Sequence, residues 1–163
     1  SDWKHHKMIK LVRTNSENTA FMLLVKQLDA YLKITDGDEH DFYNQFNSVA
    51  TLKNTVIAYF ENQPISCGAF KEFNQNSVEI KRMFTLPQSR EKGVASLILR
   101  ELENWAAELG YSSCILETGV RQTEAVAFYK KNFYKIISNY GQYTGVENSL
   151  CFEKKLLENE KRQ

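Results

Sequence analysis

The sequence has little of what marks a membrane-spanning or a duplex-binding protein. Its longest uninterrupted apolar run, Ala20–Val25, is much shorter than the ~20 residues of a membrane-spanning helix. The 163 residues contain 21 Lys and Arg against 20 Asp and Glu, so the net charge of +1 lacks the basic excess usual in proteins that bind nucleic-acid duplexes. No internal repeat or low-complexity segment is present either. We therefore expect a soluble, cytoplasmic protein that binds neither a membrane nor nucleic acid.

Cysteine is scarce as well, with only Cys67, Cys114 and Cys151 in the chain. An odd number of widely separated cysteines, each among apolar neighbours, argues against a disulfide framework. We expect three reduced, buried thiols in a reducing compartment. The sequence also contains neither the P-loop string nor the glycine fingerprint of dinucleotide-binding folds, so these two nucleotide-binding motifs are excluded.

What is present is the composition of one ordinary globular domain. Hydrophobic residues make up 42%, aromatic residues 12% and charged residues 25% of the chain, and a chain of this length buries enough surface for a single core. We place that domain at residues 8–157. Residues 1–7, which hold two of the three histidines, are expected to form a flexible N-terminal arm or to be a cloning remnant, and residues 158–163 a polar tail.

The spacing of apolar residues alternates along the chain between the period of a strand and that of a helix. Strands are predicted at residues 8–12, 55–60, 65–73, 77–85, 114–116, 136–139 and 149–154. Helices are predicted at residues 18–33, around 42–46, at 94–109 and at 123–132. Short polar connections join the second, third and fourth strands as antiparallel hairpins, and the strand–helix–strand unit that follows should be parallel and right-handed. The predicted fold class is therefore α/β or α+β with a mixed central sheet.

The segment between the fourth strand and the next helix carries the strongest chemical signal. Arg90, Lys92 and Gly93 precede that helix, and small Ala95 lies in its first turn. The first N–H groups of a helix are unpaired and lie at the positive end of its dipole, so a basic, glycine-containing loop at this point is a natural anion site. One alternative is a solvated turn that only begins a helix, and another is a binding site for a phosphate or a nucleotide.

Two motifs resemble those of the GNAT superfamily of N-acetyltransferases. Arg-x-x-Gly-x-Ala at residues 90–95 resembles its pyrophosphate-binding motif, and residues 125–133 resemble its second signature, a helix end of the form Ala-x-x-hydrophobic-Tyr-x-x-x-Gly-Phe. The predicted order of elements over residues 8–155 is also similar to that of the superfamily. The resemblance implies a mixed, mostly antiparallel sheet of about 6–7 strands, flanked by about 4 helices and splayed between its fourth and fifth strands.

Three positions depart from the motifs of the superfamily. Glu91 stands where glycine is frequent and puts a carboxylate near the expected phosphates. Asn132 replaces a glycine before Phe133, a mild change because asparagine also suits the left-handed conformation expected at this helix end. Gln122 stands in place of a frequent asparagine, as a longer amide for contact with the cofactor.

The resemblance implies that the chain binds acetyl-CoA as its cosubstrate and holds no metal. The pantetheine arm would pair with the main chain of the fourth strand, where an N–H near Met83 would polarise the thioester carbonyl. The pyrophosphate would lie on the loop and the first helical turn that follow. The implied cofactor-binding residues are Met83, Phe84, Thr85, Arg90, Glu91, Lys92, Gly93, Val94, Ala95 and Gln122.

The resemblance also implies an enzyme that moves an acetyl group directly from acetyl-CoA to a primary amine in a ternary complex. Glu79 matches the general base that deprotonates the amine, and Tyr129 matches the general acid that protonates the leaving thiolate. Glu117, at the end of the fifth strand, is an alternative base. The structural alternatives are that Glu79 is a polar residue on an exposed sheet face and that Tyr129 is a core aromatic. The alternative function is a non-catalytic acyl-CoA-binding regulatory module.

The acceptor region varies most within this superfamily, and here its residues are acidic and aromatic. They are Asp36, Asp38, Glu39, Asp41, Tyr43, Tyr140, Tyr143 and Glu147. Such groups suit a cationic amine through charge pairing and cation–π contact, whereas a solvated acidic loop is the alternative. A small amine, an antibiotic, a polyamine, and a protein lysine or N-terminus all stay open as acceptors, and the chain is expected to be a monomer or a homodimer.

Overall fold

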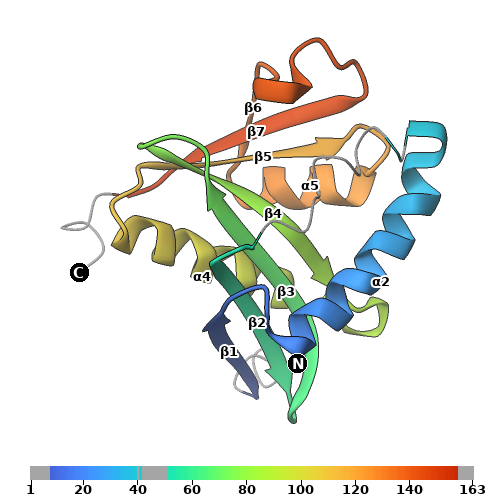
Figure 1. Cartoon of the computed structure of the whole chain (residues 1–163), viewed down its shortest axis with the longest axis vertical. Coiled ribbons are helices and arrows are strands. Elements are labelled where there is room, and N and C mark those ends of the chain that lie inside the picture. Colours follow the sequence, from blue (N-terminus) through green and yellow to red (C-terminus); the bar gives the residue numbers. More distant parts are fainter. Residues whose placement is uncertain (1–7, 40, 42–50, 158–163) are drawn as a thin grey trace. The chain divides into compact units, whose positions relative to one another are not determined.

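The computed structural model describes residues 8–39, 41 and 51–157 (Figure 1). Its strands are β1 (Ile9–Thr14), β2 (Asn54–Phe60), β3 (Gln63–Glu72), β4 (Ser77–Thr85), β5 (Ser113–Gly119), β6 (Lys135–Ile137) and β7 (Ser149–Lys155). Its helices are α2 (Thr19–Asp36), α4 (Val94–Glu108) and α5 (Thr123–Lys131), with short 3-10 turns η1 (Gly37–Glu39), η2 (Pro87–Ser89) and η3 (Gly141–Tyr143). The helix predicted around residues 42–46 lies outside the described residues. Every other predicted strand and helix is present, with boundaries shifted by a few residues.

The strands form a mixed sheet in the order β1-β2-β3-β4-β5-β7-β6. The pairs β1–β2, β2–β3, β5–β7 and β6–β7 are antiparallel. In contrast, β4 and β5 run parallel, and their ladder extends only from Ser77–Ser113 to Glu79–Ile115. The second half of β4 therefore lies outside this ladder. The predicted fold class, a mixed and mostly antiparallel sheet with helices, is confirmed.

Two compact units make up the chain, and each draws on three separate segments. Of the described residues, the first unit takes 8–31, 51–71 and 80–105, and the second takes 32–39, 41, 72–79 and 106–157. Strands β1 and β2 lie in the first unit, and β5, β6 and β7 lie in the second. The prediction of a single domain at residues 8–157 stays a prediction.

In the first unit, a glycine allows α4 to lie against the sheet. A Cβ atom added to Gly68 in β3 would lie 2.9 Å from Ile98 Cγ2 and 2.9 Å from Leu102 Cδ1, and it would also collide with Met83 Sδ. Ile98 and Leu102 are fully buried on α4. Because no side chain fits at Gly68, the helix can pack closely on this strand.

Helix α2 begins and is held by polar contacts within the first unit. Asn18 caps its start, because Asn18 Oδ1 accepts hydrogen bonds from the backbone N–H of Ala20 at 2.8 Å and of Phe21 at 3.2 Å. Further along, Asp29 forms an ion pair with Arg82 of β4, whose side chain is only 6% exposed. The pair links α2 to β4, the strand expected to contact the cofactor.

In the second unit, α5 packs on β7 through aromatic rings. The ring centroids of Tyr129 in α5 and Phe152 in β7 lie 6.1 Å apart. Tyr129 also contacts Phe128 and Tyr134, with centroid distances of 5.1 and 5.7 Å. Tyr129 is buried against a strand whose Phe152 is fully buried, so these rings anchor the short helix on β7.

The end of α5 differs from the expectation. Asn132 has a φ of −93°, so the prediction that it takes the left-handed conformation is wrong. Phe133 takes it instead, with a φ of 72°. The N–H of Phe133 bonds to the carbonyl of Lys130, and that of Tyr134 to the carbonyl of Tyr129, at 3.1 and 3.0 Å. This is the Schellman pattern, in which the left-handed residue is the one after the helix cap.

All three cysteines lie in the described part of the chain, and each is buried and outside any disulfide. The predicted burial of the three thiols is confirmed. Within the described ranges, no helix is long and apolar enough to cross a membrane.

Candidate active site

A basic loop between β4 and α4 is fixed by Arg90 in the first unit. Arg90 Nε donates a hydrogen bond of 2.9 Å to the carbonyl oxygen of Thr85, the last residue of β4. Its guanidinium carbon also lies 5.7 Å from the ring centroids of both Tyr31 and Phe84. Arg90 is therefore held by one hydrogen bond and two cation–π contacts, which gives its charge a fixed position beside the end of the strand.

The rest of this loop exposes its backbone at the start of α4. Glu91 and Gly93 have positive φ angles of 64° and 85°, and both are exposed, as is Lys92. The backbone N–H of Leu97 bonds to the carbonyl of Gly93 at 3.2 Å. Val94 begins the helix and is buried, so the first N–H groups of a long helix follow directly on a basic loop, as an anion site requires.

The predicted cofactor residues of β4 offer main-chain rather than side-chain groups. The side chain of Met83 lies against Gly68, while Phe84 and Thr85 are each only 8% exposed. The Thr85 hydroxyl is within 2.7 Å of Ser66 Oγ, which in turn donates to the carbonyl of Phe84 at 3.0 Å. The side chains are occupied within the first unit, and this suits a strand that recognises a ligand through its backbone.

Glu79 lies in the second unit and is buried, with an exposed fraction of 3%. The alternative that Glu79 is a polar residue on an exposed sheet face is therefore wrong. The hydroxyl of Tyr140 donates a hydrogen bond of 2.6 Å to Glu79 Oε2. A carboxylate that accepts such a bond is satisfied despite its burial, so Glu79 can stay buried at the end of the β4–β5 ladder.

Further polar groups gather near Glu79 from β5, η3 and β7. Burial first, and then the charges of Glu117 and Glu79, raise the pKa of Tyr143 well above its ordinary value. The same two carboxylates act after burial on Cys151, whose pKa is raised to about 11. Glu117 Oε2 accepts a hydrogen bond of 2.7 Å from Ser149 Oγ. Two carboxylates and two tyrosines, Tyr140 and Tyr143, thus occur in one region of the second unit.

Tyr129 has a different environment, made of aromatic rings. It is 7% exposed, and burial alone raises its pKa well above the ordinary value for a phenol. The phenol is therefore protonated at neutral and moderately alkaline pH, as a proton donor must be. Its ring contacts also fit the alternative of a core tyrosine, so the geometry is compatible with both interpretations.

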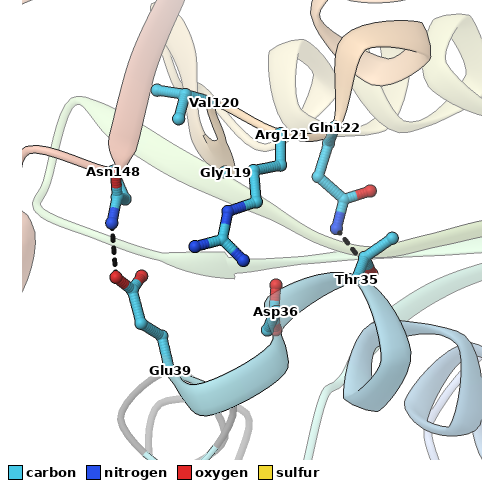
Figure 2. Close-up of a pocket in the computed structure, with 8 residues that line it drawn as sticks. All are labelled: Thr35, Asp36, Glu39, Gly119, Val120, Arg121, Gln122 and Asn148. Atoms are coloured by element: carbon cyan, nitrogen blue, oxygen red, sulfur yellow. Dashed lines mark hydrogen bonds between the residues drawn. The ribbon is translucent and has the colours of Figure 1, made fainter.

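A small hollow in the second unit holds part of the predicted acceptor region (Figure 2). It is lined by Thr35, Asp36, Glu39, Gly119, Val120, Arg121, Gln122 and Asn148. The Gln122 amide donates to Thr35 Oγ1 at 3.3 Å, and the Asn148 amide donates to Glu39 Oε1. The guanidinium of Arg121 points into the same hollow, toward the side that carries Asp36 and Glu39 (Figure 2). The acidic residues here are therefore faced by a cation.

The structure divides the predicted acceptor residues. Tyr140 and Tyr143 lie near Glu79, whereas Asp38, Asp41 and Glu147 are exposed. Tyr43 lies outside the described residues. Arg121 and Asn148 were not among the residues predicted for the site. A signal for Arg121 was its place in the loop that follows β5, because loops at the carboxyl ends of strands often line sites.

One protein-family model matches more than half of the chain. The model of the Acetyltransferase (GNAT) family matches residues 21–133, a stretch that includes both Glu79 and Tyr129. The chain belongs to the GNAT acetyltransferase family. The resemblance that the two sequence motifs indicated is thereby confirmed, and the family is one of acyltransferases.

Alignments with similar proteins cover nearly the whole GNAT chain. The IAA acetyltransferase of Azospirillum brasilense is 29% identical over 154 residues, which cover 91% of this chain and 98% of that one. A crystal structure of a Klebsiella pneumoniae protein assigned as an acyl-CoA N-acyltransferase matches with a TM-score of 0.77 and 24% identity, over 92% of this chain and 99% of that one. A GNAT family acetyltransferase from Elizabethkingia anophelis, with acetyl-CoA bound, matches with a TM-score of 0.65 and 15% identity, over 91% and 99%. The two structures establish the fold.

In the part of the chain that the structure describes, no group of three or more His, Cys, Asp or Glu could hold a metal ion.

Proposed function

We propose that the protein is an N-acetyltransferase that moves the acetyl group of acetyl-CoA directly to a primary amine. The observation that carries the proposal is a buried carboxylate, Glu79, that accepts a hydrogen bond from Tyr140 at the base position of a GNAT family chain. The Elizabethkingia relative of the same fold has acetyl-CoA bound, which supports acetyl-CoA as the donor.

The donor would be held by the basic loop and by β4. Arg90, Lys92 and the first N–H groups of α4 supply positive charge and donors for the pyrophosphate. The main chain of Met83, Phe84 and Thr85 would pair with the pantetheine arm, since their side chains are occupied elsewhere. Glu91, Gly93, Val94 and Ala95 would contribute backbone contacts in the same loop and turn, and Gln122 a side-chain amide.

Glu79 would act as the general base and Tyr129 as the general acid. The ammonium acceptor first gives one proton to Glu79, because only a neutral amine attacks a thioester. The nitrogen then forms a bond to the acetyl carbonyl carbon and the carbon–sulfur bond breaks. Tyr129 donates its proton to the CoA sulfur, and water carries the surplus proton of the nitrogen to the Tyr129 phenolate. Glu79 then releases the proton it accepted to solvent, so that both side chains return to their starting state. The products are an N-acetyl amide and CoA with a thiol.

The acceptor would be a cationic amine. The support is the pair of carboxylates, Glu79 and Glu117, and the two tyrosines, Tyr140 and Tyr143, in one region of the second unit. Carboxylates attract an ammonium group, and tyrosine rings offer cation–π contact. The hollow that holds Asp36 and Glu39 contributes less to this argument, because Arg121 points toward them.

The test is acetyl-CoA incubated with a panel of cationic and uncharged amines, with appearance of the CoA thiol as the readout. We expect thiol release that depends on both protein and amine, and that is fastest with cationic amines. Binding of acetyl-CoA without release with any amine would favour the non-catalytic acyl-CoA-binding module. Equal rates for cationic and uncharged amines would contradict the preference for a cationic acceptor but not acetyl transfer itself.

A further inference from the structure

Tyr140 reaches Glu79 from the loop between β6 and β7. Its hydroxyl lies 2.6 Å from Glu79 Oε2, a distance typical of a hydrogen bond from a hydroxyl to a carboxylate. Glu79 is 3% exposed, so few positions remain from which water could replace this donor. Burial, and after it the charge of Glu79, raises the pKa of Tyr140 well above that of an ordinary phenol. The phenol therefore stays protonated, and remains a donor, over the whole pH range in which the protein would work.

The ring of Tyr140 is held by two neighbours in the second unit. Its centroid lies 5.0 Å from that of Phe73 at an interplanar angle of 72°, and 5.8 Å from that of Tyr143 at 89°. Both are edge-to-face contacts, which fix the ring plane. Tyr143 is 4% exposed and donates its backbone N–H to the carbonyl of Tyr140 at 2.9 Å.

The loop itself is closed by its own hydrogen bonds. The Asn139 amide donates to the carbonyl of Val146 at 2.9 Å and to that of Ser149 at 3.1 Å. These bonds join the residue before Tyr140 to the start of β7. The loop thus presents the phenol as a fixed group rather than as a side chain at a free loop tip.

We propose that Tyr140 is a positioning residue for Glu79, which holds its carboxylate in one orientation for accepting a proton. The inference rests on the proposed function, in which Glu79 is the base. A hydrogen bond donated to a carboxylate favours the ionised over the protonated form. The other titratable groups of this region are Glu117 on β5, Tyr143 on η3 and Cys151 on β7. The variant Tyr140→Phe retains all three of these residues.

Tyr140→Phe keeps the ring and its contacts and removes only the donor. We expect kcat to fall about ten-fold, the KM for acetyl-CoA to stay within about two-fold, and the lower limb of the pH profile of kcat/KM to move to higher pH by about one pH unit. Incorporation of 3-fluorotyrosine at position 140 makes the phenol a stronger donor and should move that limb to lower pH. Equal loss of activity at every pH, with no movement of the limb in either variant, would overturn the proposal.

A matched control is available in the same unit. The hydroxyl of Tyr111 donates a hydrogen bond of 2.7 Å to Glu72 Oε1. This is also a bond from a phenol to a carboxylate, but it lies on the surface. Tyr111→Phe should leave the rate and the pH profile unchanged. Thermal unfolding of each variant checks that the fold is retained. If Tyr140→Phe is poorly folded, the chain with 3-fluorotyrosine decides the question, because it keeps the hydroxyl and replaces only one ring hydrogen with fluorine.

Glu79→Gln separates failure of this inference from failure of the proposed function. If Glu79 is the base, Glu79→Gln removes the lower limb, and adding Tyr140→Phe to it has no further effect. If Glu79→Gln leaves the profile as it was, the proposed base is wrong. If Glu79→Gln removes the limb but Tyr140→Phe does not move it, or the two losses simply add, the base stands and the positioning role of Tyr140 is wrong.

Discussion

The side chain of Arg90 and the carbonyl of Thr85 are joined by a hydrogen bond of 2.9 Å, which ties the loop before α4 to the end of β4. The bond connects the two segments expected to hold acetyl-CoA, the strand for its pantetheine arm and the loop for its pyrophosphate. Because the guanidinium also lies over the rings of Tyr31 and Phe84, its charge is in position before a ligand arrives. Such preorganisation lowers the cost of binding.

Arg90→Ala should therefore weaken donor binding more than it slows chemistry. We expect the KM for acetyl-CoA to rise about ten-fold or more, the effect of losing one charge-assisted contact. Arg90→Lys should recover only part of the loss, since lysine keeps the charge but has no guanidinium to stack on the rings. Arg100→Ala, at an exposed position of α4, is the control. A KM equal to that of the native chain in Arg90→Ala would remove Arg90 from the donor site.

Glu91→Gly should improve donor binding. Glu91 has a φ of 64°, a conformation that glycine adopts without strain, and its carboxylate lies in the loop proposed to meet the phosphates. We expect CoA to bind about two- to ten-fold more tightly at low salt, with the gain reduced as salt screens the charge. Glu91→Ala removes the charge but keeps a Cβ, so isothermal titration of the two variants separates charge from backbone strain. Weaker CoA binding in both variants would show that Glu91 assists the donor.

The stability of the protein should fall at alkaline pH. Burial raises the pKa of the Cys67 thiol from 9.0 to about 12 and that of the Cys151 thiol from 9.0 to about 11. The unfolded chain gives up these protons at a lower pH than the folded chain. Stability is therefore complete below about pH 9 and declines as the pH rises toward the folded values, by up to about 1.4 kcal/mol per pH unit for each thiol.

Urea unfolding at several pH values between about 8 and 10.5 measures this decline. The buried phenols of Tyr129, Tyr140 and Tyr143, whose pKa values are also raised, steepen it above pH 10. Cys67→Ala should make the slope shallower, whatever it does to the stability at pH 8. A free energy of unfolding that stays constant up to pH 10.5 would contradict the prediction.

Much of the fold could be predicted from local patterns. The spacing of apolar residues predicted β4 at residues 77–85, as observed, and placed the start of α4 at Val94. Turns were predicted less well, because their geometry depends on backbone angles that residue type only biases. The connection between β2 and β3 was predicted to include Pro64, but Glu61 and Asn62 both take positive φ angles and close the turn alone, so that Pro64 pairs with Tyr59 in the ladder.

The candidate site could be predicted only in part, because it is assembled from segments far apart in the chain. The motif positions identified Glu79 and Tyr129, but no sequence pattern links Glu79 to Tyr140, which is 61 residues away. Similarly, the carboxylates at residues 36 to 41 predicted an acidic surface, and Arg121 enters the same hollow from the loop after β5. Contacts of this kind depend on the tertiary fold, for which a local charge pattern contains no information.

The central claim, direct acetyl transfer with Tyr129 as the acid, is tested most directly by single-turnover thiol release, with the protein in excess over acetyl-CoA and a cationic amine at saturating concentration. Tyr129→Phe keeps the ring contacts of α5 and removes the proton donor, so we expect the rate of thiol release to fall about 100-fold or more while the Kd for CoA stays within about two-fold. Tyr111→Phe serves as the control and should release thiol at the native rate. An unchanged rate in Tyr129→Phe would contradict the assignment of the acid, and absence of thiol release from the native chain with every amine would contradict the proposed activity.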